Sequence, residues 1–282
     1  MLASRTGRAE PVAGPALTLP RVWGRPGGRV LAAVLLAASL AAWLATVDRM
    51  DGMDAGPGTD LGQLGWFLGV WVTMMAAMML PSAAPMVLLV ERVSRDRDGG
   101  RRRGLARAIV FAAGYLGVWA GFGLVAYGVY RALAGADLSF LSWNGGGRWV
   151  AGAVVGVAGA YQLTPLKRIC LRHCRSPLHF LFHGWHDGAT GALRMGTLHG
   201  LYCTGCCWGL MLVLFAVGVM SLPWMIVVAL VIFVEKILPH GERIARVLAV
   251  ALLALGLWIA LDPGSVPFLT DPGQPMDMDM PM

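Results

Sequence analysis

Charged residues are scarce in this chain, which is 14% charged and 57% hydrophobic with a mean hydropathy of +0.63. A soluble domain carries roughly a quarter charged residues, so the composition excludes an ordinary soluble globular protein. Several stretches of about 18 or more residues hold few or no charges, which is the signature of transmembrane helices. We therefore expect an all-α fold, a polytopic bundle of transmembrane helices.

The basic residues follow a membrane topology, although a net charge of +7 would also suit a nucleic-acid partner. The chain is predicted to have seven spans, at residues 29–47, 64–90, 107–130, 147–164, 192–220, 222–239 and 244–261. Of the 23 Lys and Arg residues, all except Arg49, Arg131 and Arg148 lie in the N-terminal segment or around the loops after the second, fourth and sixth spans. The positive-inside rule then places the N-terminus in the cytoplasm and the C-terminus outside, with no role for nucleic acid.

This topology divides the chain into three regions. Residues 1–28 form a basic cytoplasmic leader rich in Pro, Gly and Arg that we expect to be disordered. Residues 29–262 form the transmembrane helical domain, whose first span is expected to be an uncleaved signal anchor. Residues 263–282 form a disordered outer tail, ending in alternate Met residues with Asp between them. That tail is either a weak collector of copper or an incidental low-complexity sequence.

Cysteine is rare, and with none of the five predicted on the outer surface the chain does not read as a disulfide framework. Cys203, Cys206 and Cys207 lie near the start of the fifth span. Helical spacing places Cys203 and Cys206 on one face with His199 and Met195, and Cys207 at its edge. Sulfur and imidazole ligands select Cu(I) or Zn(II) over Mg or Ca, so we predict a metal site here. The alternative is that each Cys is a small buried hydrophobic residue.

The second span presents a face of methionines. Met74, Met75, Met78, Met79 and Met86 fall within an arc of about 140° on a helical wheel. Thioethers bind Cu(I) without losing a proton, so this face is predicted to bind the same ion. The alternative is that Met fills gaps in an apolar helix.

Two backbone features accompany these side chains. Gly196 and Gly200 form a Gly-x-x-x-Gly pair in the fifth span, which allows another helix to approach closely. Pro81 interrupts the second span, and it is expected to kink that helix and expose a carbonyl near Ala77. Such a break can line a binding site, although kinks that only serve packing are common.

The cytoplasmic side carries further candidate ligands. Cys170 and Cys174 are one helical turn apart, so both thiols could meet one ion and exchange it with a partner. The surrounding bases also suit an anionic lipid surface. His179, His183 and His186 then recur at helical spacing in an amphipathic interfacial segment, where they bind a metal or form the polar face.

Two ionisable residues lie at the inner end of the sixth span. Glu235 is an auxiliary candidate that could neutralise a bound cation or move a proton, because a charge at membrane depth is a functional candidate by default. Lys236 has a side chain long enough to reach the membrane interface. Neighbours in a helix point about 100° apart, so the two are not expected to pair with each other.

These motifs together resemble one bacterial family of predicted metal-binding integral membrane proteins (domain of unknown function, family 2182). The resemblance spans about residues 60–260, and its motifs are Met74–Pro81, Tyr161–Lys167 with Cys170 and Cys174, His199–Trp208, and Glu235–Lys236. It implies metal binding, sometimes copper handling, in the bacterial cytoplasmic (inner) membrane, and it names no reaction. The leader, the tail and the three histidines His179, His183 and His186 lie outside the resemblance.

Three functions remain open at this point. The first is a protein that binds Cu(I) and passes it to a soluble copper-binding protein, as a transporter or a membrane copper chaperone; nothing in the chain resembles an ATP-binding motif, so no primary pump is implied. The second is a membrane thiol–disulfide oxidoreductase using the pairs Cys203/Cys206 and Cys170/Cys174. The usual Cys pair on the outer face is missing, so we do not expect an enzyme. The third is an assembly or scaffold protein with a structural Cu or Zn ion. The methionine face favours Cu(I) over Zn(II).

Overall fold

The computed structural model describes residues 26–50, 61–135, 146–176, 180, 184–218, 221–238, 241–267 and 269. These residues hold eight α-helices, one short 3-10 helix and no β-strand, which confirms the all-α prediction. The helices are α2 (Pro26–Met50), α3 (Leu64–Asp98), α4 (Arg101–Gly135), α5 (Arg148–Tyr161), α6 (Pro165–Arg175), α8 (Gly188–Val217), α9 (Leu222–Ile237), α10 (Gly241–Leu261) and η3 (Pro263–Ser265). Residues 1–25 of the leader, most of the tail, most of the first outer loop, His179 and His183 lie outside the described residues.

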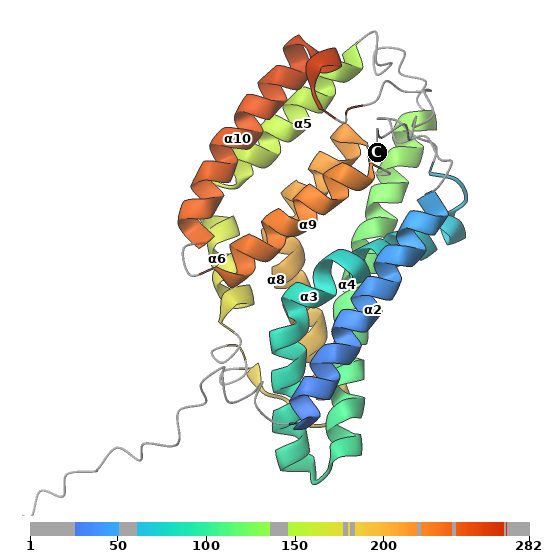
Figure 1. The fold of residues 1–282 in the computed structure, drawn as a ribbon, viewed down its shortest axis with the longest axis vertical. Coiled ribbons are helices and arrows are strands. Elements are labelled where there is room, and N and C mark those ends of the chain that lie inside the picture. Colours follow the sequence, from blue (N-terminus) through green and yellow to red (C-terminus); the bar gives the residue numbers. More distant parts are fainter. Residues whose placement is uncertain are drawn as a thin grey trace, which may run out of the picture.

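The helices form two packed groups joined by α8 (Figure 1). On one side α3 packs between α2 and α4, and on the other α5 packs along α10. α8 packs against α4 in the first group and α5 in the second, and α9 contacts α3, α8 and α10. Of the five longest apolar helices, α3 and α8 are the most buried. The methionine-rich and cysteine-rich helices are therefore the inner helices of the bundle.

Helices coincide with all seven predicted spans, but not all are long enough to cross a membrane alone. Five helices are long and apolar enough to cross a membrane: α2, α3, α4, α8 and α10. α5 and α6 meet the same requirement only when they are taken together, as a pair bent by 65°. α9 has 16 residues, which is about 24 Å of helix against a hydrocarbon core of about 30 Å. Length and composition thus support five or six crossings, and the count of seven stays a prediction.

Large apolar side chains also cover the outside of the bundle. On α10 Val247 is 72% exposed and Val250 is 68% exposed, and Val125 of α4 is 65% exposed. Soluble proteins rarely leave such faces in water. The apolar exterior and the long apolar helices both indicate a membrane protein.

Pro81 lies inside the continuous helix α3, and the carbonyl that it leaves unpaired is used for packing. Proline has no N–H, so the carbonyl of Ala77, four residues earlier, loses its helical donor. Ser39 of α2 supplies the replacement, because its Oγ donates to Ala77 O at 2.7 Å in the buried interior. The carbonyl expected to be exposed is instead satisfied by the neighbouring helix, since a buried carbonyl without a partner is costly.

The glycine pair of α8 allows α4 to approach closely, as predicted. A Cβ added to Gly196 would collide with the backbone carbonyl of Phe111. One added to Gly200 would lie 3.0 Å from Val118 Cβ and 3.1 Å from Tyr115 O. The absence of side chains at these two positions therefore sets the distance between α4 and α8.

The contact of Ser39 with Ala77 O predicts an energetic coupling to Pro81. Ser39→Ala should lower the free energy of unfolding by about 1–3 kcal/mol, because it leaves a buried carbonyl unpaired. In a Pro81→Ala background the new N–H can bond to Ala77 O, so the same substitution should cost less. Unfolding of the four variants in detergent measures the coupling, and an equal cost in both backgrounds would contradict it.

Candidate metal centre

Three thiols of α8 lie in the centre of the bundle. Cys203, Cys206 and Cys207 are each at most 1% exposed. Cys206 Sγ lies 3.2 Å from Cys207 Sγ, and it donates to the carbonyl of Cys203 at 3.2 Å. Their spacing in the sequence therefore does place the three sulfurs together inside the protein.

The short helix α6 adds a fourth thiol. Thr164 caps α6 by accepting a hydrogen bond from Lys167 N at 3.3 Å, and Pro165 occupies the first turn. The bend after α5 lays α6 against α8. As a result Cys174 Sγ lies 3.8 Å from Cys206 Sγ and also interacts with Cys203. We call Cys174, Cys203, Cys206 and Cys207 the thiol cluster.

A lysine points into the thiol cluster rather than out to an interface. Lys236 of α9 donates to Cys203 Sγ at 3.0 Å and to Ser82 Oγ of α3 at 3.2 Å. On the other side Tyr115 Oη of α4 is hydrogen-bonded to the same sulfur at 3.0 Å. An ammonium and a hydroxyl thus converge on Cys203, which is suited to hold the negative charge of a thiolate, the form that binds metal.

Glu235 is occupied by a different lysine. Its carboxylate accepts from Lys167 of α6 at 2.8 and 3.1 Å, and each side chain is only 1% exposed. This is a buried, two-bonded ion pair between α6 and α9. Through this pair Glu235 joins α9 to α6, and its predicted roles toward a cation or a proton stay predictions.

His199 lies one turn before Cys203 among aromatic rings. Its ring centroid is 5.8 Å from those of Phe111 and Tyr115 and 5.7 Å from that of Phe180. The side chain is buried, and Nδ1 has no hydrogen-bond partner within the described residues. His199 is thus a packed histidine with one nitrogen still available as a ligand.

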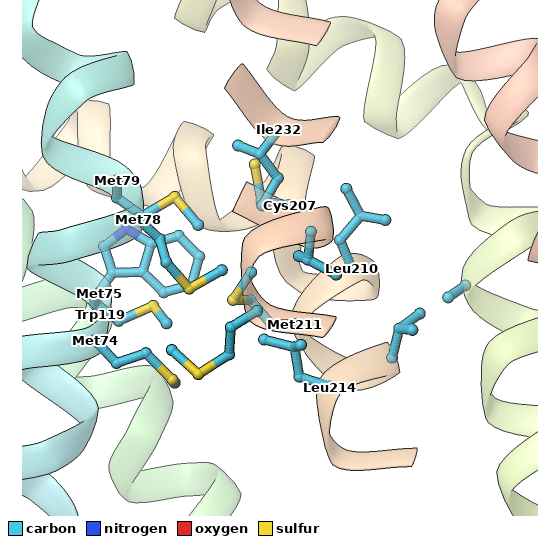
Figure 2. Close-up of a cluster of buried hydrophobic side chains, with 14 of the residues drawn as sticks. Met74, Met75, Met78, Met79, Trp119, Cys207, Leu210, Met211, Leu214 and Ile232 are labelled. Carbon is cyan, nitrogen blue, oxygen red and sulfur yellow. The ribbon is translucent and has the colours of Figure 1, made fainter. Parts of the chain in front are cut away.

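The methionine face of α3 is turned inward. Met74, Met75, Met78 and Met79 are between 0% and 3% exposed and belong to one buried cluster with the α8 thiols. Figure 2 shows these four side chains extending toward α8, where Met211 and Cys207 lie. The auxiliary candidates Met86 and Met195 lie in a separate buried cluster around Phe111.

The other described candidates on the cytoplasmic side are Cys170 and His186. The Cys170 thiol packs against α8 at Gly205, where an added Cβ would be 2.7 Å from Sγ, and Cys170 belongs to the same buried cluster as the α8 thiols. That Cys170 and Cys174 meet one ion stays a prediction. His186 Nε2 is 2.8 Å from an Arg194 nitrogen, and its Nδ1 is 2.9 Å from the carbonyl of Gly184.

The spacing of the sulfurs can be compared with that of metal ligands. Two thiolates at about 2.3 Å from one tetrahedral ion lie about 3.8 Å apart. The Cys174–Cys206 separation of 3.8 Å equals this value, and the Cys206–Cys207 separation of 3.2 Å is shorter. Across the described part of the chain, no three or more His, Cys, Asp and Glu residues form a ready-made metal site. A metal here would need a small rearrangement or thioether ligands, and the ligand residues stay a prediction.

Three residues of the centre were not among the predicted ligands. Lys236 was identified only as a residue able to reach the interface, and Tyr115 and Met211 were not singled out. A tyrosine and a lysine within apolar helices were the available signal, since polar groups at membrane depth need partners. Their contacts with Cys203 could not be predicted from the sequence. Helical spacing shows which residues share a face of one helix, but not which other helix packs against that face.

Buried thiols and thioethers within a bundle of long apolar helices define the class of a helical protein suited to soft metal ions. Residues 68–259 match the family described as PpoB2, copper chaperone, and the chain belongs to this family. No curated protein and no solved structure matches the chain. The match confirms the expected association with a metal-binding family and with copper. The description of the matched family does not mention family 2182, the domain of unknown function that the motifs resemble.

The buried ion pair gives a stability prediction. Glu235→Gln should lower the free energy of unfolding by about 3–5 kcal/mol, because it leaves the Lys167 ammonium buried without a counter-charge. A Lys167→Met, Glu235→Leu double variant should recover much of that loss. Glu242→Gln, which removes an exposed ion pair with Arg172, is the matched control and should change little. Unfolding in detergent tests this, and a harmless Glu235→Gln would show that the pair does not hold α6.

Proposed function

We propose that this chain is a membrane copper chaperone that binds Cu(I) at the thiol cluster and passes it to a second copper-binding protein. The observation that carries the proposal is that Cys174 of α6 meets Cys206 of α8, 3.8 Å away, beside the Lys236 ammonium. Membership of a copper chaperone family supports it independently. The proposed location is the bacterial cytoplasmic membrane, with the N-terminus in the cytoplasm.

The ligand chemistry favours Cu(I). Thiolates accept Cu(I) or Zn(II), whereas neutral thioethers are ligands for the softer ion. The α8 thiols and the methionine face belong to one buried cluster. Zinc remains the rival ion, and offering both metals to the purified protein separates the two cases.

Cys174 is the proposed point of exchange. It is half-buried, whereas Cys203, Cys206 and Cys207 are buried. At this edge a thiolate of the partner protein can bind the copper ion and displace Cys174. Ligands are then exchanged one at a time, so copper is never released as a free ion. Cys170, whose thiol packs against Gly205 of α8, is proposed to contact the ion only during exchange, so it is not needed for the ion to be retained.

The direct test is the metal content of the purified, reduced protein with copper and zinc both offered. Wild type should retain copper, and a Cys203→Ser, Cys206→Ser, Cys207→Ser variant should retain little. Cys170→Ser is the matched control, because it removes a thiol that lies outside the thiol cluster, and it should retain nearly the wild-type amount. Equal copper in wild type and the triple variant would overturn the proposal.

The oxidoreductase alternative gives a different result with the same protein. All five cysteines are free in this structure, and a chaperone should keep them as thiols through a cycle of loading and release. An oxidoreductase would form a disulfide within the thiol cluster during turnover. Trapping of free thiols after exposure to an oxidising partner decides between them, and an exchanging disulfide would favour the enzyme.

Lys236 should control how strongly the ion is held. Lys236→Met removes the charge opposite Cys203 and should weaken Cu(I) binding by about 10–100-fold, the usual effect of losing a residue that supports a ligand. Lys236→Arg keeps the charge and should bind more tightly than Lys236→Met. Competition with a Cu(I) chelator measures this, and unchanged affinity in Lys236→Met would contradict the role.

A further inference from the structure

Methionine is concentrated at one place in the interior. Besides the four Met residues of α3, the same buried cluster contains Met50 of α2, Met211 of α8 and Met225 of α9, and the last two are 0% exposed. Four helices therefore contribute thioethers to this cluster. Figure 2 shows the α3 side chains and Met211 extending toward one another beside the ring of Trp119.

Packing alone does not require this choice of residue. Leu fills a helical core with better-defined rotamers, whereas Met is flexible and specifies a core less well. The same helices use Leu at neighbouring buried positions, including Leu210 and Leu214 of α8. Thioether sulfur is the property that Met adds and Leu lacks.

We propose that Met75, Met78 and Met211 form a second site for a monovalent soft ion, separate from the thiol cluster and built only from neutral ligands. Trp119, which is 0% exposed and in the same buried cluster, contributes its aromatic face to the cation. The site rests on the proposed function, because it supplies the copper that the thiol cluster holds.

The two sites differ in charge. An ion bound by thioethers keeps its full positive charge in an apolar interior, which is costly. The same ion bound at Cys203 is neutralised by a thiolate, with no change in its oxidation state. The thioether site is therefore the weaker one. Cys207 of the thiol cluster belongs to the same buried cluster as Met79 and Met211. This arrangement favours transfer from the thioethers to the thiols.

Ag(I) is a suitable probe, since it has the charge and softness of Cu(I) and is not oxidised in air. The full chain is purified in detergent as a thiol-cluster variant in which Cys170 and the four Cys residues of the thiol cluster are all changed to Ser, so that no thiol remains to bind Ag(I). This variant should still bind Ag(I), and adding Met75→Leu, Met78→Leu and Met211→Leu should remove that binding. Met86→Leu in the same background is the matched control, because Met86 lies in the other buried cluster.

Tryptophan fluorescence gives a second readout. Bound Ag(I) should quench Trp119 in the thiol-cluster variant, and Trp119→Phe should remove the quenched component. Met-to-Leu changes nearly conserve volume and usually cost less than about 1.5 kcal/mol. If the triple Met variant does not fold, Met211→Leu alone should still weaken Ag(I) binding.

The outcomes separate this inference from the proposed function. A thiol-cluster variant that binds no Ag(I), or binds it equally with and without the three Met residues, overturns the second site. A thiol-cluster variant that retains as much Ag(I) as wild type, and loses it only with the Met substitutions, supports the second site and overturns the proposed role of the thiols.

Discussion

The contact between the Lys236 ammonium and the Cys203 sulfur is the interaction on which the rest of the structure depends. A charge inside an apolar bundle must find a partner, and Lys236 finds Cys203 at 3.0 Å with Ser82 at 3.2 Å. That requirement fixes α9 against α8 and α3. Its neighbour Glu235 points to another side of α9 and takes Lys167, which fixes α6. Two adjacent charged residues thereby position the helix that carries the fourth thiol.

The centre combines two kinds of sulfur with different electrostatic demands. Thiolates need compensating positive charge, and Lys236 and Tyr115 provide donors at Cys203. Thioethers need none, so the methionine face can be fully buried. A metal ion that moves from the thioethers to the thiolates exchanges neutral ligands for negatively charged ones, and its ligand atoms remain sulfur. Under the proposed function, this exchange of ligands would allow copper to be held and then released to a partner.

The sequence predicts the helices and which residues share a helix face, but not the side-chain contacts between helices. Apolar runs predicted the helices, and helical spacing predicted that Cys203 and Cys206 share a face. The Gly196 and Gly200 pair predicted a close helix contact, which α4 makes. Tertiary partners could not be read from periodicity: Ser39 on the Ala77 carbonyl, Cys174 on Cys206, and Lys236 on Cys203 each join segments far apart in the chain. Hydropathy also could not show that α9, with 16 residues, is too short for a full crossing, so the count of seven spans stays a prediction.

X-ray absorption spectroscopy of the copper-loaded, reduced protein tests the central claim most directly, because it reports the ligands of the ion itself. Copper should be bound as Cu(I) in an all-sulfur or sulfur-dominated shell, with Cu–S distances of about 2.3 Å, similar to those of other thiolate-bound metals. A shell of nitrogen and oxygen ligands alone would contradict the claim that the buried sulfurs of α3, α6 and α8 are the copper site.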